Sequence, residues 1–363
     1  MNPSSRGSVA IVTGSAGLVG AEAARQFAAL GLDVIGIDND QRRAFFGEEA
    51  STRDERIALQ REVPRYRHLD IDIRDEAAVA SLFADLGADI ALVIHAAAQP
   101  SHDWAASDPA ADFAINATAT LGLLDRVRRH CPSALFILMS TNKVYGDHPN
   151  RLPLVETPTR WELSADHAFF ARGIDESLSI DQCAHSVFGV SKVAADLMTQ
   201  EFGRRFGIPT VCFRAGCITG PRHRGAFLHG FLAHLCASAA AGAPYSIIGY
   251  GGKQVRDNLH CADLAAAFRA VFAAPKIGAV YNIGGGRQGA CSILEALDLC
   301  EALTGRPVER VYRDEARFGD HIWWISDVSR FQSDYPQWRP TRDAATIIAE
   351  LIAGARRAAP RRA

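Results

Sequence analysis

A glycine-rich stretch near the start of the sequence decides the fold: Val9-Ala-Ile-Val-Thr-Gly14-Ser-Ala-Gly17-Leu-Val-Gly20. It begins as a short β-branched strand, and three glycines spaced three residues apart lead into an Ala- and Leu-rich helix. In a nucleotide-binding turn, Gly14 permits the sharp turn, Gly17 lets the backbone approach a pyrophosphate, and Gly20 lets the helix pack on the strand. The phosphates would lie at the helix N-terminus, where unpaired N–H groups favour negative charge. Ordinary strand-to-helix turns also contain such glycines, so the segments that follow decide whether this turn binds a nucleotide.

Those segments support a nucleotide-binding role. The helix extends to about Leu30, Gly31 marks its C-terminal end, and Asp33-Val-Ile-Gly-Ile-Asp38 predicts a second strand that ends in a carboxylate. Asp38 lies eighteen positions after Gly20, near the spacing at which an acidic residue accepts hydrogen bonds from the adenosine ribose of a dinucleotide. We therefore expect NAD as the cofactor.

The residues after Asp38 bear on the choice between NAD and NADP. Arg42 and Arg43 keep NADP open as an alternative, but Asp38 would repel its 2′-phosphate, so NAD is preferred. The polar segment 39–67 is long for a connection between two strands. It predicts either a flap over the adenosine end of the cofactor or a solvated helix on the rim, and the sequence does not decide between them.

Strands and helices alternate along the first 215 residues. This order predicts an α/β protein with a Rossmann-type, doubly wound parallel sheet, whose ligands gather at the carboxyl ends of the strands. The further predicted strands cover 68–73, 90–98, 135–139 and 210–214, and the predicted helices cover 76–86, 108–129 and 188–206.

The pattern changes after residue 215. We expect 216–254 and 286–355 to form a smaller, C-terminal substrate-binding lobe, in which a helix covers 227–241. Strands at 255–260 and 280–286 are expected to return to the first sheet or its edge, so that 255–285 rejoins the domain formed by 1–215. The substrate is expected between the two lobes. The basic segment 356–363 predicts a flexible tail.

Composition excludes several classes of function. The 363 residues are 48% hydrophobic and 22% charged, with a net charge of −2 and a pI near 6.6. Near-neutral charge without a basic block argues against nucleic acid or an anionic membrane as the main partner. The sequence contains neither an apolar signal segment nor a run long enough to span a bilayer, so we expect a soluble, cytoplasmic protein.

Cysteine and histidine spacing indicates neither disulfides nor a metal site. No C-x-x-C occurs among the eight cysteines, which lie mostly among apolar neighbours and are expected to be reduced and buried. His229 and His234 are five residues apart and do not share a helix face, so no metal site is predicted.

Taken together, these motifs resemble the extended short-chain dehydrogenase/reductase family, and within it the nucleotide-sugar epimerases and dehydratases. The resemblance covers nearly the whole chain and implies transient oxidation of a sugar carbon with tightly bound NAD, followed by re-reduction from the other face. The segments that carry it are Thr13–Gly20, Asp38, Asp72, Ala96–Ala98, Asn116, Ser140–Gly146, Ser191-Lys192, Arg214 and Gln254–Asp257.

The resemblance also implies roles for individual residues. Thr141 would position the reacting sugar hydroxyl, and Lys192 would hold the nicotinamide ribose and lower the pKa of a neighbouring base. For Asn116, a polar residue inside an apolar helix, a structural hydrogen-bonding role is preferred over a catalytic one. The expected cofactor contacts are Gly14, Ala16, Gly17, Leu18, Val19, Asp38, Asn39, Asp72, Ile73, Ala96, Ala97, Ala98, Asn116, Ser140 and Lys192. The expected substrate contacts are Gln99, Ser101, Thr141, Asn142, Lys143, Phe188, Cys217, Arg222, His223 and Arg256.

Asn142, expected to be catalytic, and Lys143 distinguish branches of the family, although a role that only shapes the loop also fits Lys143 and, less well, Asn142. Sugar 4,6-dehydratases carry Asp-Glu at these positions, because eliminating water requires an acid and a base, and an amide with a lysine does not replace that pair. The resemblance is closer to C2 epimerases, which implies a CDP-hexose or CDP-deoxyhexose substrate. Arg256 would bind its diphosphate with a planar fork of donors. Arg222, His223 and Arg224 form either a second cationic loop or a solvated turn.

Phe188 departs from the family pattern. The catalytic tyrosine of the family stands four residues before the lysine, and this chain has Phe188-Gly-Val-Ser-Lys192. A phenyl ring neither accepts nor donates a proton, so the expected base is absent. Three explanations remain open. Another group replaces the tyrosine, with His185 preferred; or Lys192 acts itself or through water; or the protein binds NAD and a nucleotide sugar without turnover. Cys183 and Cys217 are the other candidates for a replacement base; Tyr145 carries the missing phenol, but a structural role is preferred for it.

The family resemblance also implies a homodimer. Its interface is expected to involve the helices near 108–129 and 188–206.

Overall fold

The computed structural model describes residues 7–223 and 230–358, which divide into two compact units. The first unit contains the described parts of 1–144, 186–214 and 264–281; the second contains 145–185, 215–263 and the part after 281. Segment 145–185 thus groups with the second unit, whereas the sequence places it in the first domain. The reason is pairing: Ile174 forms a parallel bridge with Ser326, and the Arg160 guanidinium binds the Glu295 carboxylate.

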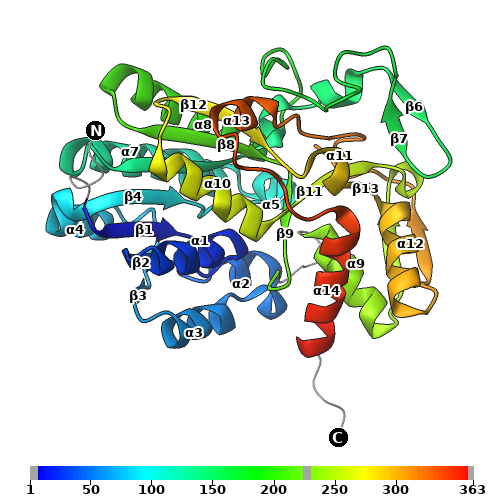
Figure 1. Ribbon diagram of the computed structural model, residues 1–363, viewed down its shortest axis with the longest axis horizontal. Helices are drawn as coiled ribbons and strands as arrows, with labels where there is room; N and C mark the ends of the chain where they lie inside the picture. The colour runs from blue at the N-terminus through cyan, green and yellow to red at the C-terminus, as the bar shows by residue number, and fades with distance from the viewer. Residues whose placement is uncertain (1–6, 224–229, 359–363) are drawn as a thin grey trace, which may run out of the picture. The chain divides into compact units, whose positions relative to one another are not determined.

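A seven-stranded sheet forms the centre of the first unit (Figure 1). Its strand order is β12-β8-β5-β4-β1-β2-β3. Strands β2 and β3 lie on one side of β1, and β4 and the later strands lie on the other side, as in doubly wound nucleotide-binding folds. β1 pairs in parallel with both β2 and β4. The predicted Rossmann-type sheet is confirmed. The strands are β1 Val9–Thr13, β2 Asp33–Ile37, β3 Tyr66–Leu69, β4 Ile90–His95, β5 Leu135–Thr141, β8 Thr210–Ala215 and β12 Ala279–Ile283.

Two groups of helices accompany this sheet. Helices α4, α7 and α8 pack in series, whereas α1 packs with α3 and, through the Phe27–Phe272 ring contact of 5.4 Å, with α10. The bounds are α1 Leu18–Ala29, α2 Gln41–Phe46, α3 Arg53–Glu62, α4 Glu76–Leu86, α5 His102–Ser107, α6 Pro109–Phe113, α7 Ala119–His130, α8 Val187–Phe206 and α10 Cys261–Ala273.

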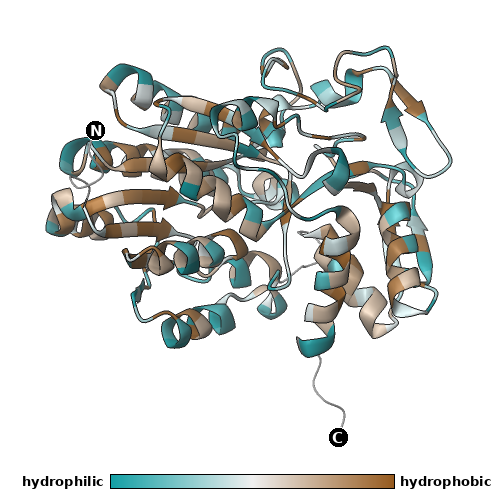
Figure 2. Cartoon of the chain, viewed as in Figure 1, coloured by the Kyte–Doolittle hydropathy of each residue, from teal (hydrophilic) through white to brown (hydrophobic). Residues whose placement is uncertain are grey.

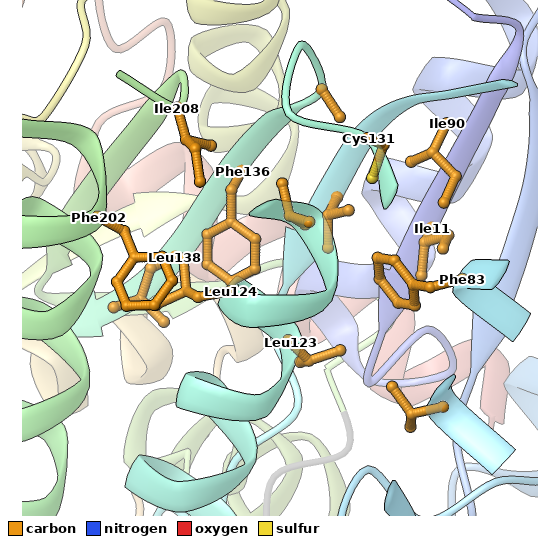
Figure 3. Close-up of a cluster of buried hydrophobic side chains, with 14 of the residues drawn as sticks. Ile11, Phe83, Ile90, Leu123, Leu124, Cys131, Phe136, Leu138, Phe202 and Ile208 are labelled. Carbon is orange, nitrogen blue, oxygen red and sulfur yellow. The ribbon is translucent and has the colours of Figure 1, made fainter. Parts of the chain in front are cut away.

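The main core lies between the sheet and the α4-α7-α8 group. Phe136 of β5 lies near Leu124 of α7 and Phe202 of α8 there, and Ile11 of β1 lies near Phe83 of α4 (Figure 3). Every residue of β1 and β4 is buried, and Figure 2 shows these strands as mainly hydrophobic. A continuous apolar run of this kind is what a parallel strand covered on both faces requires.

Three local features of the first unit differ from the sequence prediction. Strand β3 begins at Tyr66 and ends at Leu69, so Asp72 lies in the turn before α4 and not in a strand. The predicted 108–129 helix is α6 and α7 joined by a π-helical turn, Ala114–Thr118. The six-residue helix α5 is unpredicted. Segment 39–67 forms α2, α3 and a short 3-10 turn, which agrees with helices at the rim and leaves the flap untested.

The second unit consists of small sheets and a helical core. β11 pairs with β13 and β9, so the expectation that 255–260 returns to the first sheet is wrong, whereas β12 does join it. The pairs β6-β7 and β10-β14 form separate ribbons. The strands are β6 Leu154–Glu156, β7 Trp161–Leu163, β9 Cys217–Thr219, β10 Tyr245–Ile248, β11 Val255–His260, β13 Ala290–Ser292 and β14 Arg310–Arg313.

Helices α9, α12 and α14 pack together around a second buried cluster. α14 continues to Ala358, so residues 356–358 are helical and not frayed; the rest of the predicted tail lies outside the described residues, as do Arg224, His229 and the expected helix start at 227. The bounds are α9 Phe231–Ala241, α11 Gly286–Gly289, α12 Ile293–Thr304, α13 Ser329–Asp334 and α14 Ala344–Ala358.

The packing of the core predicts that two leucines of α7 contribute differently to the free energy of unfolding. Leu124 is fully buried and Leu121 is 41% exposed. Leu124→Ala should lower the free energy of unfolding by about 2–5 kcal/mol, because it leaves a cavity beneath the sheet. Leu121→Ala should change it by no more than about 0.5 kcal/mol. Urea denaturation followed by circular dichroism measures both, and equal losses would contradict the assignment of this core.

Candidate cofactor site and active site

The glycine turn after β1 is held by close backbone contacts. Gly14 has a φ of +65° and donates its N–H to the Ile37 carbonyl at 2.8 Å. A Cβ at Gly14 would lie 2.8 Å from the Ala97 nitrogen, and one at Gly20 would lie 2.2 Å from the Gly14 carbonyl oxygen. The sharp turn expected at Gly14 and the close helix approach at Gly20 are therefore confirmed.

The N-terminus of α1 fits an anionic group. Its N-cap is Gly17, whose backbone is extended and which supplies no side-chain hydrogen bond, and the first turn carries no acidic residue. By contrast, the Asp75 side chain caps α4. The N–H groups at the start of α1 are thus left for a ligand, and the phosphates of a dinucleotide suit them. Ala16, Leu18 and Val19, expected to contact the cofactor, lie at this end of the helix.

Asp38 follows β2 and links two loops. Its carboxylate accepts hydrogen bonds from the Ala16 N–H at 3.0 Å and the Asp40 N–H at 2.9 Å. Burial raises the pKa of Asp38 despite these bonds. The Arg42 guanidinium lies over the Phe46 ring, 5.3 Å from its centroid, and Arg43 pairs with Glu48 at 2.9 Å. Both arginines already have protein partners.

Asp72 is the second acidic residue expected at the adenosine end. Its carboxylate accepts hydrogen bonds from the Arg74 side chain at 3.0 and 2.6 Å and from Asn39 Nδ2 at 3.1 Å. The hydrogen bond from Arg74 is the main reason that the pKa of Asp72 is lowered. Asn39 and Asp72 therefore lie side by side, as they must if both contact the same part of the cofactor. Ile73 instead packs against the main core.

A buried polar network fixes the loop after β4. Asn116, in the π-helical turn, accepts from the Gln99 N–H at 3.0 Å and donates to Asp112 Oδ1 at 3.0 Å and Ser191 Oγ at 3.1 Å. Ser191 in turn donates to Asp112 Oδ2 at 2.6 Å. These bonds join Gln99, which follows Ala96–Ala98, to α8, and the Gln99 side chain in turn binds the Ser101 carbonyl. They support the structural explanation of Asn116 and reveal Asp112, a fully buried carboxylate that sequence reasoning missed.

The expected reaction residues at the end of β5 lie close together. Ser140 Oγ donates to Asp196 Oδ2 at 2.5 Å, and Asp196 forms a buried ion pair with Arg214 at 3.0 Å. Thr141 Oγ1 donates to Asn142 Oδ1 at 3.3 Å and accepts from the Lys143 N–H at 3.2 Å. The strand thus ends in a hydroxyl, an amide and an ammonium group.

Lys192 of α8 reaches the same strand. Its Nζ donates to the Met139 carbonyl at 2.7 Å, and its side chain is buried. Burial lowers the pKa of Lys192 to about 8, although Asp196 and Asp112 oppose the shift. This ammonium therefore carries a positive charge at pH 7 in a poorly solvated position.

Phe188 lies one helical turn before Lys192 and is also buried. The His102 ring of α5 packs edge-on against it, with the ring centroids 5.1 Å apart and an interplanar angle of 73°. His102 Nδ1 lies 2.6 Å from Ser186 Oγ, which accepts the Gly189 N–H and caps α8. Sequence reasoning missed His102, although it follows Gln99 and Ser101, both expected substrate contacts.

The remaining expected site residues belong to the second unit. His185 lies beside Cys183, with ring nitrogen to Sγ distances of 3.5 and 3.7 Å. Tyr145 is buried and donates its hydroxyl to Asn282 Oδ1 at 2.8 Å. Arg256 binds the Asp320 carboxylate at 2.5 Å and the His321 carbonyl at 2.6 Å.

The last three belong to β9 and the loop after it. Cys217 is half-buried in β9, Arg222 is exposed, and His223 Nδ1 lies 3.2 Å from Thr219 Oγ1. Their contact with a substrate stays a prediction, as do the individual roles of the residues in the first unit.

Within 7–223 and 230–358, no three His, Cys, Asp or Glu side chains are arranged to hold a metal ion. None of the helices in these ranges is both long and apolar enough to cross a membrane. All eight cysteines lie within these ranges and outside disulfides, and six are buried, as the sequence predicts; Cys183 and Cys217 are half-buried.

Comparison with known proteins decides the family. Residues 10–284 match the model of the NAD dependent epimerase/dehydratase family. The chain belongs to this family. The epimerase/dehydratase proteins are NAD-dependent enzymes of nucleotide-sugar metabolism, so the cofactor expected from Asp38 and the glycine turn is NAD.

Two curated relatives of this epimerase/dehydratase act in different ways. The chain is 32% identical to CDP-paratose 2-epimerase of Salmonella typhi over 298 residues, covering 80% of this chain and 83% of the relative. It is 30% identical to dTDP-glucose 4,6-dehydratase of Salmonella typhimurium over 285 residues, covering 76% and 71%. Family membership therefore does not by itself assign the reaction.

Solved structures share the fold of this epimerase/dehydratase. One is a tyrosine-to-phenylalanine mutant of UDP-glucuronic acid 4-epimerase from Bacillus cereus, in complex with UDP-4-deoxy-4-fluoro-glucuronic acid and NAD. It has a TM-score of 0.78 at 22% identity, over 96% of this chain and 99% of that one. Another is dTDP-glucose 4,6-dehydratase from Bacillus anthracis with NAD, with a TM-score of 0.74 at 19% identity over 97% of each chain.

The glycine turn predicts a specific loss of cofactor affinity. Gly14→Ala and Gly31→Ala both place a Cβ at a positive φ, which costs about 1–2 kcal/mol, but only at Gly14 does that Cβ meet backbone atoms. Gly14→Ala should weaken NAD binding at least about tenfold, or about 1.4 kcal/mol. Gly31→Ala should leave the affinity unchanged. Calorimetric titration with NAD compares them, and unchanged affinity in Gly14→Ala would contradict this position of the cofactor.

Lys192 predicts a pH-dependent stability. Between pH 8 and 10.5 the unfolded chain keeps the Lys192 proton while the folded chain loses it, so the free energy of unfolding should rise with pH. Relative to Lys192→Met, NAD-free wild type should gain about 1.4 kcal/mol per pH unit in this window and nothing below it. Urea denaturation from pH 7 to 10 measures this difference. A difference that stays constant with pH would refute the shifted lysine.

Proposed function

We propose that this protein is an NAD-dependent nucleotide-sugar epimerase that oxidises a sugar carbon transiently to a ketone and re-reduces it from the other face. The substrate proposed is a CDP-hexose or CDP-deoxyhexose, inverted at C2. Identity of 32% with CDP-paratose 2-epimerase, over 83% of that relative, supports this choice of carbon and nucleotide.

The observation that carries the proposal is the chemistry at the end of β5. Thr141, Asn142 and Lys143 offer a hydroxyl, an amide and an ammonium group, and no carboxylic acid. Dehydration needs an acid and a base at the carbons that lose water, whereas epimerisation by oxidation and re-reduction needs only one site of proton exchange at the reacting hydroxyl. The residue types at 142 and 143 therefore favour epimerisation over elimination.

Residues of the first unit would bind the cofactor and position the sugar. When bound, NAD supplies reversible hydride transfer. The N-terminus of α1 would hold its diphosphate, and Asp38 and Asp72 would contact its adenosine half. Thr141 would position the sugar hydroxyl. Lys192 would hold the nicotinamide ribose, and its charge would stabilise the alkoxide that develops during oxidation.

The substrate residues of the second unit would act on the nucleotide. Arg256 would bind the diphosphate through its planar guanidinium, exchanging its ion pair with Asp320 for the phosphate oxygens. Arg222 and His223 would add positive charge at the nucleotide end. A homodimeric, cytoplasmic enzyme is part of the same proposal.

Incubation of purified protein with a CDP-hexose and with its 2-deuterated form tests the proposal. We expect interconversion of the C2 epimers without added NAD, with deuterium retained at C2, because the same hydride leaves and returns. Deuterium entering C2 from D2O would indicate proton abstraction and contradict the proposal.

Other products of the same assay identify the alternative functions. Inversion at C4 would identify a 4-epimerase, and accumulation of NADH would identify a dehydrogenase. If wild type is inert toward all nucleotide sugars tested while Phe188→Tyr is active, the wild-type protein is a non-catalytic NAD-binding protein and the proposal fails.

A further inference from the structure

The contact between His102 and Phe188 points to the group that exchanges the substrate proton. Oxidation of a sugar hydroxyl releases a proton, and Phe188 presents only carbon and hydrogen where a tyrosine is expected four residues before Lys192. The His102 ring packs directly against this phenyl ring, at 5.1 Å between centroids. Phe188 is 6% exposed and His102 is half-buried, so the imidazole lies beside the expected site of the missing phenol and keeps contact with solvent.

His102 is also held in a defined orientation. Its Nδ1 lies 2.6 Å from Ser186 Oγ, and this serine is the N-cap of α8, the helix that carries Phe188 and Lys192. Ser186 Oγ accepts the Gly189 N–H at 3.0 Å and has a second lone pair that can accept Nδ1–H. In that tautomer the lone pair of the imidazole is on Nε2. The contact therefore holds the ring in place, and the Nδ1–H tautomer is the one in which Nε2 carries the lone pair that accepts a proton.

Neighbouring groups are less suited to this step. The Lys192 ammonium donates to the Met139 carbonyl and, while charged, has no lone pair. Thr141 and Asn142 do not ionise in the accessible pH range. His185, preferred from the sequence, contacts Cys183, whereas His102 contacts the ring that replaces the tyrosine.

We propose that His102 is the catalytic base and acid that replaces the missing tyrosine, with Nδ1–H donated to Ser186 and Nε2 exchanging the proton of the reacting sugar hydroxyl. This inference rests on the proposed epimerase function. In the oxidation step the C–H bond breaks, its electron pair leaves with the hydride for the oxidised nicotinamide, the O–H proton moves to Nε2, and a C=O bond forms. The return step reverses each movement, so His102 returns the proton to the oxygen and ends neutral.

Four variants of the full-length protein test the role in turnover. His102→Ala should lower kcat by about 10²–10⁴-fold, as removal of a general base does, while NAD and CDP binding measured by calorimetry stay within about twofold. The double variant His102→Ala/Phe188→Tyr should recover at least about tenfold of this loss, because the phenol restores an ionisable hydroxyl beside Lys192. His102→Gln, which keeps a hydrogen-bonding side chain, should stay as inactive as His102→Ala. His130→Ala, a half-buried histidine of α7, is the matched control and should keep wild-type kcat.

The tautomer provides a readout that is independent of turnover. Nitrogen-15 NMR of the NAD-free protein should show His102 protonated on Nδ1, and Ser186→Ala should shift its population toward the Nε2–H form. An Nε2–H tautomer in wild type would overturn the inference, as would His102→Ala with a kcat within threefold of wild type. Loss of NAD binding in both His102→Ala and His102→Gln would assign the residue a structural role and likewise overturn the inference.

The outcomes separate this inference from the proposed function. An active wild type with an active His102→Ala refutes only the role of His102. An inert wild type refutes the epimerase function and with it the catalytic role of His102, whatever the tautomer is. An active wild type with an inactive, NAD-binding His102→Ala that regains activity with Phe188→Tyr supports both.

Discussion

The close approach of three backbone segments at the end of β1 is the constraint on which the first unit depends. Gly14 lies against Ala97 after β4, Gly20 lies against the Gly14 carbonyl, and the Asp38 carboxylate after β2 binds the Ala16 N–H. Any side chain larger than hydrogen at Gly14 or Gly20 would separate α1 from the sheet. The same contacts leave the start of α1 without a side-chain cap. The packing that closes the fold thus also produces the site for an anionic cofactor.

Polar side chains extend this arrangement from the cofactor turn to the reacting residues. The network of Asn116, Asp112 and Ser191 ties the loop after β4 to α8, and Asp196 ties α8 to Ser140 and Arg214. Because buried polar groups cost free energy unless they are paired, this network admits few alternative arrangements. It holds α8 in a fixed rotation about its axis. Lys192 consequently meets β5 and Phe188 meets α5.

The sequence alone predicts those elements whose own residues specify both their secondary structure and their place in the fold. Glycine spacing, a buried β-branched strand and a terminal Asp38 predict β1, α1 and β2, since each is specified by its own residues. β11 was assigned to the wrong sheet, because an alternating or apolar strand pattern does not specify its partner. The helix α5 is too short for a helical period, and His102 was missed with it. Its relation to Phe188 joins residues 86 positions apart, which no spacing rule within the sequence reveals.

The π-helical turn at Ala114–Thr118 links the polar network to the main core through a single helix. One residue of an α-helix corresponds to about 100° of rotation, so removing the extra residue of this turn would rotate α7 by roughly that amount relative to α6. Either Asp112 and Asn116 would then leave Gln99 and Ser191, or Leu123 and Leu124 would leave the sheet. An insertion or deletion in this segment would therefore disrupt either the polar network or the core, whereas a substitution leaves the rotation of α7 unchanged. The angular position of one helix thus determines both the loop at the cofactor site and the packing of the core.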